Sequence, residues 1–378
     1  MNILHIYKDY FPVLGGIETY IKILAEAQAS SGHTVTVLVC NQGLRTQTEY
    51  INGVTILKTG RLATVASMPL SIIQPIVLSS LHPDLTHLHS PYPLGELANW
   101  MLGRSKNTVI AYHSDIVRQK GWLTLYGPFL RRILTSAGRI IVSSPYYLEK
   151  SPWLRPIQDK CRIIPYGVDT TRFTPSPNKE TGKSFRLLFV GRLRYYKGLE
   201  TLFHALSSVP DVHLAIIGDG PMRKNWEALS GKLGLGQKVQ FVGEVQDKDL
   251  PLWYHRADLF VLPSNARSEA FGIVLLEAMA SGLPCITTEL GTRTSWVVQN
   301  KKTGLVIPPG DPETLARSIL TLIENPTWTR ALGEAGRKRV EEHFSLQGMI
   351  EQVETLYREV VQTKSTNRKS ASWGCKVL

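Results

Sequence analysis

Short apolar segments alternate with longer helical segments in two series along this chain, one before residue 145 and one after residue 184. Parallel strands need long crossover connections, so this alternation predicts sheets of parallel strands that are covered by helices on both faces. A chain of 378 residues is also long enough for two hydrophobic cores. The predicted fold class is therefore α/β, with two Rossmann-like parallel-sheet domains.

The element ranges follow from the periodicity of apolar residues. The first series contains predicted strands at residues 3–6, 34–39, 55–58, 85–89, 109–112 and 140–143, and predicted helices at 17–30, 70–81, 94–102 and 123–137. The second contains predicted strands at 185–190, 213–218, 239–242, 259–262 and 285–287, followed by predicted helices at 313–323, 327–341 and 346–361. A linker rich in Pro, Ser and Gly separates them at 174–184. We therefore predict domains at 1–174 and 175–345, a final helix at 346–361, and a basic tail at 362–378 that is disordered.

The formal net charge of +12 is concentrated in parts of the chain. Residues 101–162 contain eleven Lys or Arg residues and three acidic residues, and the last seventeen residues contain four basic residues and no acidic one. Basic residues interleave with aromatic ones at 116–134. A solvated surface, a nucleic-acid site and an anionic membrane face compete as interpretations. Because no RNA- or DNA-binding motif occurs, nucleic acid is not expected as a partner, and the membrane face is preferred to plain solvation.

The four cysteines, at positions 40, 161, 285 and 375, show no paired spacing. Neither a disulfide framework nor a zinc site is indicated, so a reducing compartment is expected. The first residues lack the basic start and apolar core of a signal peptide, and no apolar run reaches membrane-spanning length. We therefore expect a cytoplasmic protein that is neither exported nor integral to a membrane.

Two glutamates separated by seven residues, Glu269 and Glu277, follow a predicted buried strand at 259–262. Helical spacing of apolar residues predicts a helix at 272–281. In an open α/β sheet this loop lies at the carboxyl ends of the strands, where such folds bind ligands. The two carboxylates can accept hydrogen bonds from sugar hydroxyls there. The alternative is a buried helix with two incidental acids.

The residues between the glutamates form the predicted start of that helix. Unpaired amides and the helix dipole attract phosphate at such a position. The predicted donor-binding backbone comprises Ala270, Phe271, Gly272 and Ile273.

This passage resembles the donor site of retaining glycosyltransferases of family 4. The similarity lies in Glu-x7-Glu after a strand, Phe-Gly at the helix start, and Glu-Ala-Met-Ala-Ser-Gly-x-Pro after it. It covers nearly the whole chain and is weakest at 41–80 and in the tail. The resemblance implies the two-domain GT-B fold, an active site in the cleft between the domains, and a C-terminal helix that crosses back to the first domain.

A second motif, in which Gly191 and Arg192 are followed by Lys197 and Gly198, leads from a predicted strand into a helix. Arginine offers a planar fork of donors to phosphate oxygens, and lysine a compact charge. By itself this is a common charged loop. The resemblance implies that Arg192 and Lys197 bind the donor diphosphate, and two fixed cations can neutralise a departing nucleotide without a metal ion. No metal and no cofactor are therefore expected.

His113 ends a predicted strand, and a histidine at that place would face the ligand edge of the sheet. Taken alone, it is better interpreted as a structural histidine. The resemblance implies that it lies against the donor sugar, and Asp115 could orient it or hold an acceptor hydroxyl. His87 and His89 alternate with an apolar residue in a way that suits strand packing, so they are not assigned as ligands.

Several loops complete the predicted site. Gly15 and Gly16 follow the first strand, but they do not form the fingerprint of a dinucleotide site. The resemblance implies that they lie near the donor diphosphate and the acceptor. Gly218 and Gly220 line the nucleotide pocket or form a plain βα turn, and Val245 frames the base. Arg293 is an extra phosphate ligand or an exposed residue.

The expected reaction is transfer of a hexose from a nucleotide diphosphate with retention at the anomeric carbon. The predicted catalytic residues are His113, Arg192, Lys197 and Glu269. The segments after His113 and Ser144 most resemble bacterial mannosyltransferases of O-antigen and surface polysaccharide synthesis, which implies GDP-mannose as donor. The implied acceptor is a saccharide on polyprenyl diphosphate, met by an enzyme that is peripheral on the inner face of the cytoplasmic membrane. An epimerase of the same fold acting on a UDP-sugar and a non-catalytic polyanion-binding protein are the alternatives.

Overall fold

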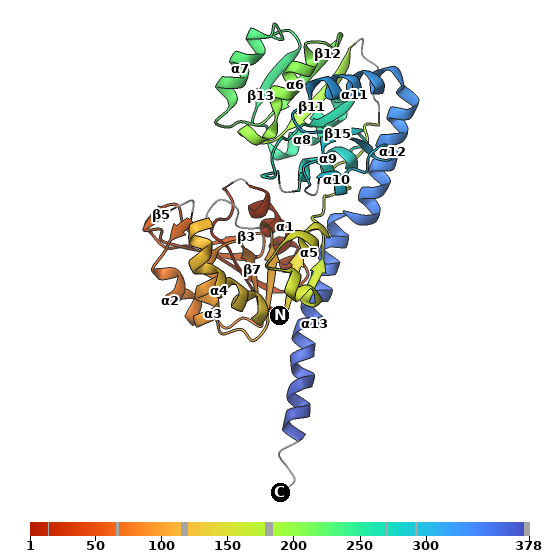
Figure 1. The fold of residues 1–378 in the computed structure, drawn as a ribbon. Helices are drawn as coiled ribbons and strands as arrows, with labels where there is room; N and C mark the ends of the chain where they lie inside the picture. Colours follow the sequence, from red (N-terminus) through yellow and green to blue (C-terminus); the bar gives the residue numbers. More distant parts are fainter. Residues whose placement is uncertain are drawn as a thin grey trace. The chain divides into compact units, whose positions relative to one another are not determined.

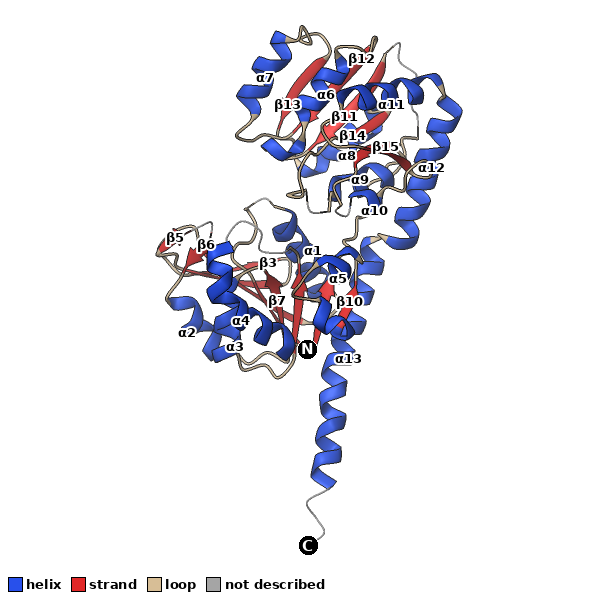
Figure 2. Cartoon of the chain, in the orientation of Figure 1, coloured by secondary structure: helices blue, strands red, loops and turns tan. Residues whose placement is uncertain are grey.

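The chain forms two compact units in this computed structural model, which describes residues 1–13, 15–65, 68–114, 120–177, 184–269, 271–291 and 294–373. The first unit comprises Met1–Pro165 together with Ile350–Leu378, and the second comprises Tyr166–Met349 (Figure 1). Figure 2 shows that each unit contains its own sheet surrounded by helices. The predicted α/β class with two parallel-sheet units is confirmed.

The first unit contains an eight-stranded sheet in the order β10-β9-β8-β7-β1-β2-β4-β3. All neighbouring strands are parallel except β3 and β4, which are antiparallel. The central strand β7 is buried along its whole length, because helices cover both faces of such a sheet. The strands are β1 (Asn2–Ile6), β2 (Thr34–Cys40), β3 (Gln47–Ile51), β4 (Val54–Thr59), β7 (Leu85–Ser90), β8 (Thr108–Tyr112), β9 (Arg139–Val142) and β10 (Cys161–Ile163).

Helices and one hairpin complete the first unit. A short hairpin of β5 (Ala63–Val65) and β6 (Met68–Leu70) precedes α2, and α3 packs against both α2 and α4. Among the described residues, no helix has both the length and the apolar character that crossing a bilayer requires. The helices are α1 (Gly16–Ser30), α2 (Ile73–Ser80), α3 (Pro93–Leu102), α4 (Lys120–Ser136), α5 (Tyr146–Lys150) and η1 (Arg155–Lys160).

The second unit contains a six-stranded, fully parallel sheet in the order β13-β12-β11-β14-β15-β16. Its strands are β11 (Phe185–Val190), β12 (Val212–Ile217), β13 (Val239–Gly243), β14 (Leu259–Leu262), β15 (Cys285–Thr288) and β16 (Gly304–Ile307). Its helices are η2 (Tyr195–Lys197), α6 (Leu199–Leu206), α7 (Arg223–Lys232), η3 (Asp247–Asp249), α8 (Leu250–Arg256), α9 (Ile273–Ala280), α10 (Thr294–Val297), α11 (Pro312–Glu324) and α12 (Pro326–His343).

Both sheets reverse their strand order next to their first strand. In the first unit β1 lies between β2 and β7, and in the second β11 lies between β12 and β14. Loops leave neighbouring strands in opposite directions at such a reversal, which opens a crevice at the carboxyl ends of the two strands. The fold thus gives each unit one place where a ligand is expected.

The last helix, α13 (Leu346–Trp373), begins in the second unit and continues in the first from Ile350 onward. Its Tyr357 hydroxyl is hydrogen-bonded to Nδ1 of His87, so the helix is part of the core of the first unit. The prediction of a helix that returns to the first domain is therefore confirmed. Its predicted end at residue 361 was wrong, because no glycine or proline interrupts the chain before Gly374.

The units divide at Pro165, earlier than the predicted boundary at residue 174. Residues just after Pro165 belong to the second core: Tyr166 packs edge-on against Phe271, and Phe173 against Tyr254. The sequence pattern also missed the short strands β3, β10 and β16 and the β5–β6 hairpin. Strand β3 is largely exposed, and β10 has only three residues, so neither shows a clear apolar run.

Candidate active site

A buried ion pair occupies the strand-order reversal of the second unit. Lys197, in η2 after β11, places its Nζ 2.7 Å from Oε2 of Glu269, in the loop after β14. Both side chains are more than nine-tenths buried. Ser264 donates a second hydrogen bond of 2.9 Å to the same Glu269 oxygen. The structure thus brings together two predicted site residues that lie 72 positions apart in the sequence.

The loops around this pair interlock closely. A Cβ on Gly198 would lie 2.0 Å from the carbonyl oxygen of Pro263, and one on Gly218 would lie 2.3 Å from that of Gly191. Both glycines also have positive φ, at 69° and 116°, so a side chain is excluded on two grounds. The loops that follow β11, β12 and β14 therefore meet at one edge of the sheet. Gly220, beside Leu193, belongs to the same group of contacts.

Arg192 adds a second cation to this edge. It follows Gly191, at which a Cβ would lie 3.3 Å from Nζ of Lys197. Arg192 is exposed, and no ion pair is found for it within the part of the chain that the structure describes. An exposed guanidinium on the residue after Gly191, together with the buried ammonium of Lys197, suits an anionic ligand with two or more oxygens.

Glu277 has a different set of partners. Its Oε2 accepts a hydrogen bond of 2.7 Å from the hydroxyl of Tyr254, in α8. Burial raises the pKa of Glu277 from 4.5 to about 7, although the Tyr254 hydrogen bond opposes the rise. A carboxyl group with this pKa is an effective hydrogen-bond acceptor for a hydroxyl near neutral pH.

The start of α9 is built as the sequence predicts. Gly272 precedes the helix with a φ of 75°, and Ile273 is its first residue. The ring of Phe271 is buried against Tyr166 at a centroid distance of 4.9 Å and lies near Trp296 and Phe344. This aromatic cluster fixes the backbone at the helix start. Ala270 lies outside the described residues.

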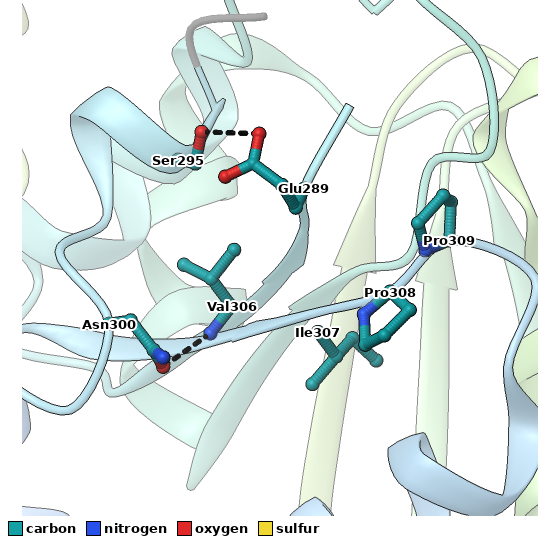
Figure 3. A pocket seen from close by; sticks show the side chains of 7 residues that line it. All are labelled: Glu289, Ser295, Asn300, Val306, Ile307, Pro308 and Pro309. Carbon is teal, nitrogen blue, oxygen red and sulfur yellow. Dashed lines mark hydrogen bonds between the residues drawn. The ribbon is translucent and has the colours of Figure 1, made fainter. Parts of the chain in front are cut away.

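The remaining predicted residues of the second unit follow strands of its sheet, and so lie at or near the carboxyl edge of that sheet. Val245 is half-buried just after β13, whose last carbonyl, at Gly243, accepts from the Gly218 amide at 2.7 Å. Beyond β15, Glu289 lines a hollow of about 500 Å³ with Ser295 and Asn300. Figure 3 shows Glu289 accepting from Ser295 and Asn300 accepting from the Val306 amide. Arg293, in the same loop as Glu289, lies outside the described residues.

In the first unit, Gly15 and Gly16 lie at the start of α1, as predicted. A Cβ on Gly15 would lie 2.1 Å from Oε2 of Glu18, so a carboxylate covers this glycine. Burial raises the pKa of Glu18 above its usual value. The two glycines are therefore next to an acidic side chain that the sequence analysis did not include.

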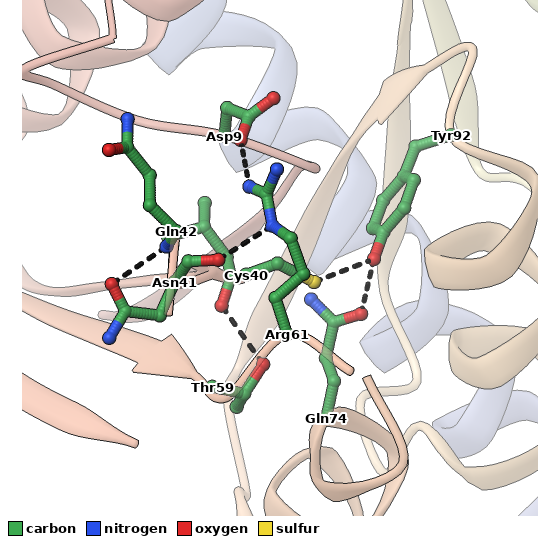
Figure 4. Close-up of polar contacts among 9 residues, drawn as sticks. Asp9, Cys40, Asn41, Gln42, Thr59, Arg61, Gln74 and Tyr92 are labelled. Carbon is green, nitrogen blue, oxygen red and sulfur yellow. Dashed lines mark hydrogen bonds and ion pairs between the residues drawn. The ribbon is translucent and has the colours of Figure 1, made fainter. Parts of the chain in front are cut away.

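A polar network ties the neighbouring loops of the first sheet together (Figure 4). Arg61, after β4, pairs with Asp9, after β1, at 2.5 Å and donates to the Asn41 carbonyl, after β2, at 2.7 Å. The Tyr92 hydroxyl, after β7, donates to Gln74 at 2.5 Å. These bonds fix the backbone at the carboxyl edge of the sheet.

His113 follows β8 and is buried. Its Nε2 lies 3.1 Å from Nδ1 of His89, and its carbonyl accepts a 2.5 Å hydrogen bond from the hydroxyl of Tyr147. Both the ring and the backbone of His113 are thus held. Asp115 lies outside the described residues.

Three histidines of the first unit resemble a metal site. His5, His87 and His89 bring one ring nitrogen each within 4.8 Å of one another. Both ring nitrogens of His5 and of His89 are already hydrogen-bonded. A cation would have to break these bonds, and no carboxylate or thiolate belongs to this group among the described residues. A hydrogen-bonded cluster is the better description.

Four residues with defined contacts to the site were missed by the sequence analysis, namely Ser264, Tyr254, His5 and His89. The first two hold the predicted glutamates, and their roles depend on tertiary packing alone. A signal for the histidines did exist, because His5 and His89 lie within the predicted strands at residues 3–6 and 85–89.

We expect the Lys197→Ala and Glu269→Ala variants each to lower the free energy of unfolding by about 3–5 kcal/mol, because each leaves the other charge buried without its partner. The double variant Lys197→Met/Glu269→Leu should recover most of this loss. Urea unfolding of the full chain measures the three differences. Single variants as stable as the parent protein would show that the pair is not desolvated in solution.

Glu277 predicts a pH dependence of stability. Because its folded pKa is raised from 4.5 to about 7, its ionisation destabilises the folded state as the pH rises through that range. The Glu277→Gln variant keeps an acceptor for Tyr254 without ionising. Its free energy of unfolding relative to the parent should rise by about 2–3 kcal/mol between pH 4.5 and pH 8. An equal difference at both pH values would contradict the raised pKa.

The sequence matches families of known proteins over most of its length. Residues 14–172 match the family model described as Glycosyltransferase Family 4, and residues 171–339 match that described as Glycosyl transferases group 1. The chain is 35% identical over 355 residues to D-rhamnosyltransferase WbpZ of Pseudomonas aeruginosa, covering 91% of this chain and 92% of the relative. It is 34% identical to O-antigen chain mannosyltransferase C of Escherichia coli, covering 97% and 100%.

A solved structure shows the same fold. Sucrose-phosphate synthase from Thermosynechococcus elongatus superimposes with a TM-score of 0.79 and 25% identity, covering 96% of this chain and 99% of that one. The fold is the predicted GT-B fold. By sequence and by structure, the chain belongs to the family 4 glycosyltransferases.

Proposed function

We propose that the protein is a retaining hexosyltransferase that takes mannose from GDP-mannose and transfers it to a lipid-linked saccharide during surface polysaccharide synthesis. The observation that carries the proposal is the Lys197–Glu269 pair at the strand-order reversal, next to Gly191, which Arg192 follows in the chain. The names of the two relatives described above, a mannosyltransferase and a rhamnosyltransferase of bacterial polysaccharides, support the substrate class.

In this proposal, different residues bind different parts of the donor. Lys197 and Arg192 bind the diphosphate and stabilise the charge of the leaving nucleotide, with the amides at the start of α9. Glu269 holds the hexose hydroxyls, Glu277 the ribose hydroxyls, and His113 the transferred sugar. No step requires a metal ion, because two cationic side chains supply the charge that a metal would supply.

The Lys197–Glu269 bond fits this division of roles. Before the donor arrives, each charge satisfies the other inside the protein. When the donor binds, its diphosphate can take the place of Glu269 as the partner of Lys197. A sugar hydroxyl can likewise take the place of Lys197 as the partner of Glu269. The site is thus preorganised, because both side chains are held in place before binding.

An apolar surface of the first unit supports a membrane-bound acceptor. Helix α3 packs against α2, and Arg104, just beyond α3, donates to the Ser79 carbonyl at the end of α2. Exposed Arg131 and Arg132 lie on α4, which also packs against α3. Apolar side chains flanked by basic ones suit the surface of an anionic bilayer. The exposed apolar residues of this surface, called the α2–α3 patch, are Ile72, Ile73, Ile76, Trp100, Met101 and Leu102.

We therefore propose that the enzyme works in the cytoplasm, bound to the inner face of the membrane through the α2–α3 patch. Its acceptor would be a saccharide on polyprenyl diphosphate. The basic residues beside the patch would attract both the anionic lipids and the diphosphate of that acceptor.

A panel of nucleotide sugars tests the reaction. With GDP-mannose and a polyprenyl-diphosphate-linked saccharide, we expect release of GDP and a product heavier by one hexose, with the anomeric configuration retained by NMR. Arg192→Ala should lower the rate at least about 100-fold, because it removes a charge that stabilises the leaving group. Arg194→Ala, which changes another exposed arginine two positions away, is the matched control and should leave the rate unchanged.

Three results would contradict the proposal. Turnover only with another donor would remove the sugar assignment. Release of nucleotide without any acceptor or water-derived product would favour an epimerase. Full activity of Arg192→Ala would remove the site assignment.

Sedimentation with vesicles of phosphatidylglycerol and phosphatidylethanolamine tests the α2–α3 patch. We expect Ile76→Asp and Met101→Asp each to weaken vesicle binding about tenfold, because each replaces an exposed apolar side chain with an acid. Leu252→Asp, which changes a similarly exposed residue of the second unit, should bind as the parent does. If all three variants bind equally, the patch is not the membrane-binding surface.

A further inference from the structure

Four histidines lie on three adjacent strands of the first sheet. His5 is on β1, His87 and His89 are on β7, and His113 directly follows β8. Each is buried, with an exposed fraction of 4% or less. Buried imidazoles must find hydrogen-bond partners inside the protein, so their contacts are informative.

Three of the histidines form a continuous chain with a glutamine. Oε1 of Gln28, on α1, lies 2.8 Å from Nε2 of His5, and Nδ1 of His5 lies 3.0 Å from Nε2 of His89. Nδ1 of His89 then lies 3.1 Å from Nε2 of His113. The rings of His89 and His113 are nearly parallel, with an interplanar angle of 8°. The chain thus runs from the fully buried Gln28 to the predicted catalytic histidine.

The chain has a direction because the carbonyl oxygen of Gln28 can only accept. It accepts a hydrogen bond from the Nε2–H of His5, which leaves Nδ1 of a neutral His5 as an acceptor. His89 must then donate from Nε2 and accept at Nδ1. By the same rule, His113 donates from Nε2, and its accepting nitrogen is Nδ1.

This logic holds while the imidazoles are neutral. Burial lowers the pKa of His5 to about 4. It also lowers the pKa of His87 and His89 well below the usual value, and the neighbouring histidines add to the effect. A second proton on any member would reverse the adjoining bonds, and burial opposes it.

We infer that Gln28, His5 and His89 are positioning residues that hold the His113 ring and keep its proton on Nε2. Their role rests on the function proposed for His113. A neutral ring does not repel the positive charge that develops on a sugar during transfer, as an imidazolium would.

Other contacts restrict the same ring. The edge of Tyr20 meets His89 and His113 at centroid distances of 5.9 and 5.4 Å. His87 is separate from the chain: its Nδ1 is hydrogen-bonded to Tyr357, although its ring lies 4.4 Å from that of His89. The hydrogen-bonded chain therefore includes His5, His89 and His113 but not His87.

The direct test is ¹⁵N NMR of the full-length protein labelled at histidine, because the protonated and unprotonated nitrogens of neutral imidazole have well-separated shifts. At neutral pH we expect His5, His89 and His113 each to be protonated at Nε2 and unprotonated at Nδ1. Protonation of His113 at Nδ1 would overturn the inference. So would stoichiometric metal in the purified protein that is lost in His89→Asn.

Gln28→Leu tests the functional role, because it removes the acceptor at the start of the chain without touching the predicted site residues. We expect a mixture of His113 tautomers, a kcat about tenfold lower and an unchanged KM for the donor, as for other residues that orient a ligand-binding histidine. Gln74→Leu is the matched control, because Gln74 is also a buried glutamine whose carbonyl accepts one hydrogen bond, from Tyr92. It should leave the His113 tautomer unchanged, so that a mixture of tautomers is specific to loss of the Gln28 acceptor.

The NMR spectrum and the measured kcat together distinguish failure of this inference from failure of the proposed function. If no donor is turned over, the NMR spectrum of the parent protein still decides the direction of the chain. If Gln28→Leu does not fold, that spectrum decides it as well. Normal kcat in a folded Gln28→Leu variant with mixed tautomers would overturn the positioning role while leaving the transferase assignment intact.

Discussion

The second unit depends on one desolvated ion pair, between Lys197 and Glu269. Removing two charges from water is costly, and here the cost is offset by a 2.7 Å contact and by the Ser264 hydroxyl. Two well-packed apolar residues would stabilise the fold at least as well. This agrees with the ligand-binding role proposed for the pair. The close loop packing at Gly198 and Gly218 serves to keep these charges at the edge of the sheet.

The two units use the same topological position with opposite electrostatics. Where the second sheet reverses its strand order, it places buried charges that pair with each other. Where the first sheet reverses, His5 and its neighbours stay neutral because burial lowers their pKa. The buried charges of the second unit suit a diphosphate. The neutral histidines of the first unit, whose hydrogen bonds run in one direction, suit hydroxyl groups. This contrast agrees with the roles proposed for donor phosphate and sugar.

Much of the fold was predictable, because apolar periodicity marks buried strands and helices such as β11 and α9. The edge strand β3 was not, since an exposed strand needs no apolar run. Lys197 and Glu269 were predicted from their motifs, each as a ligand-binding residue. Their bond to each other was not, because it joins loops 72 positions apart. The Gln28 chain was missed for the same reason: its members look like ordinary core residues until the strands are placed side by side.

Helix α13 belongs to both units, and its buried residues Val353, Leu356 and Tyr357 complete the core of the unit that begins with Met1. During synthesis, the strands of the first unit leave the ribosome long before this helix does. The core of the first unit can therefore be completed only after this helix has been synthesised. The second unit is formed by one continuous segment of chain, so its core needs no residue from a distant part of the sequence.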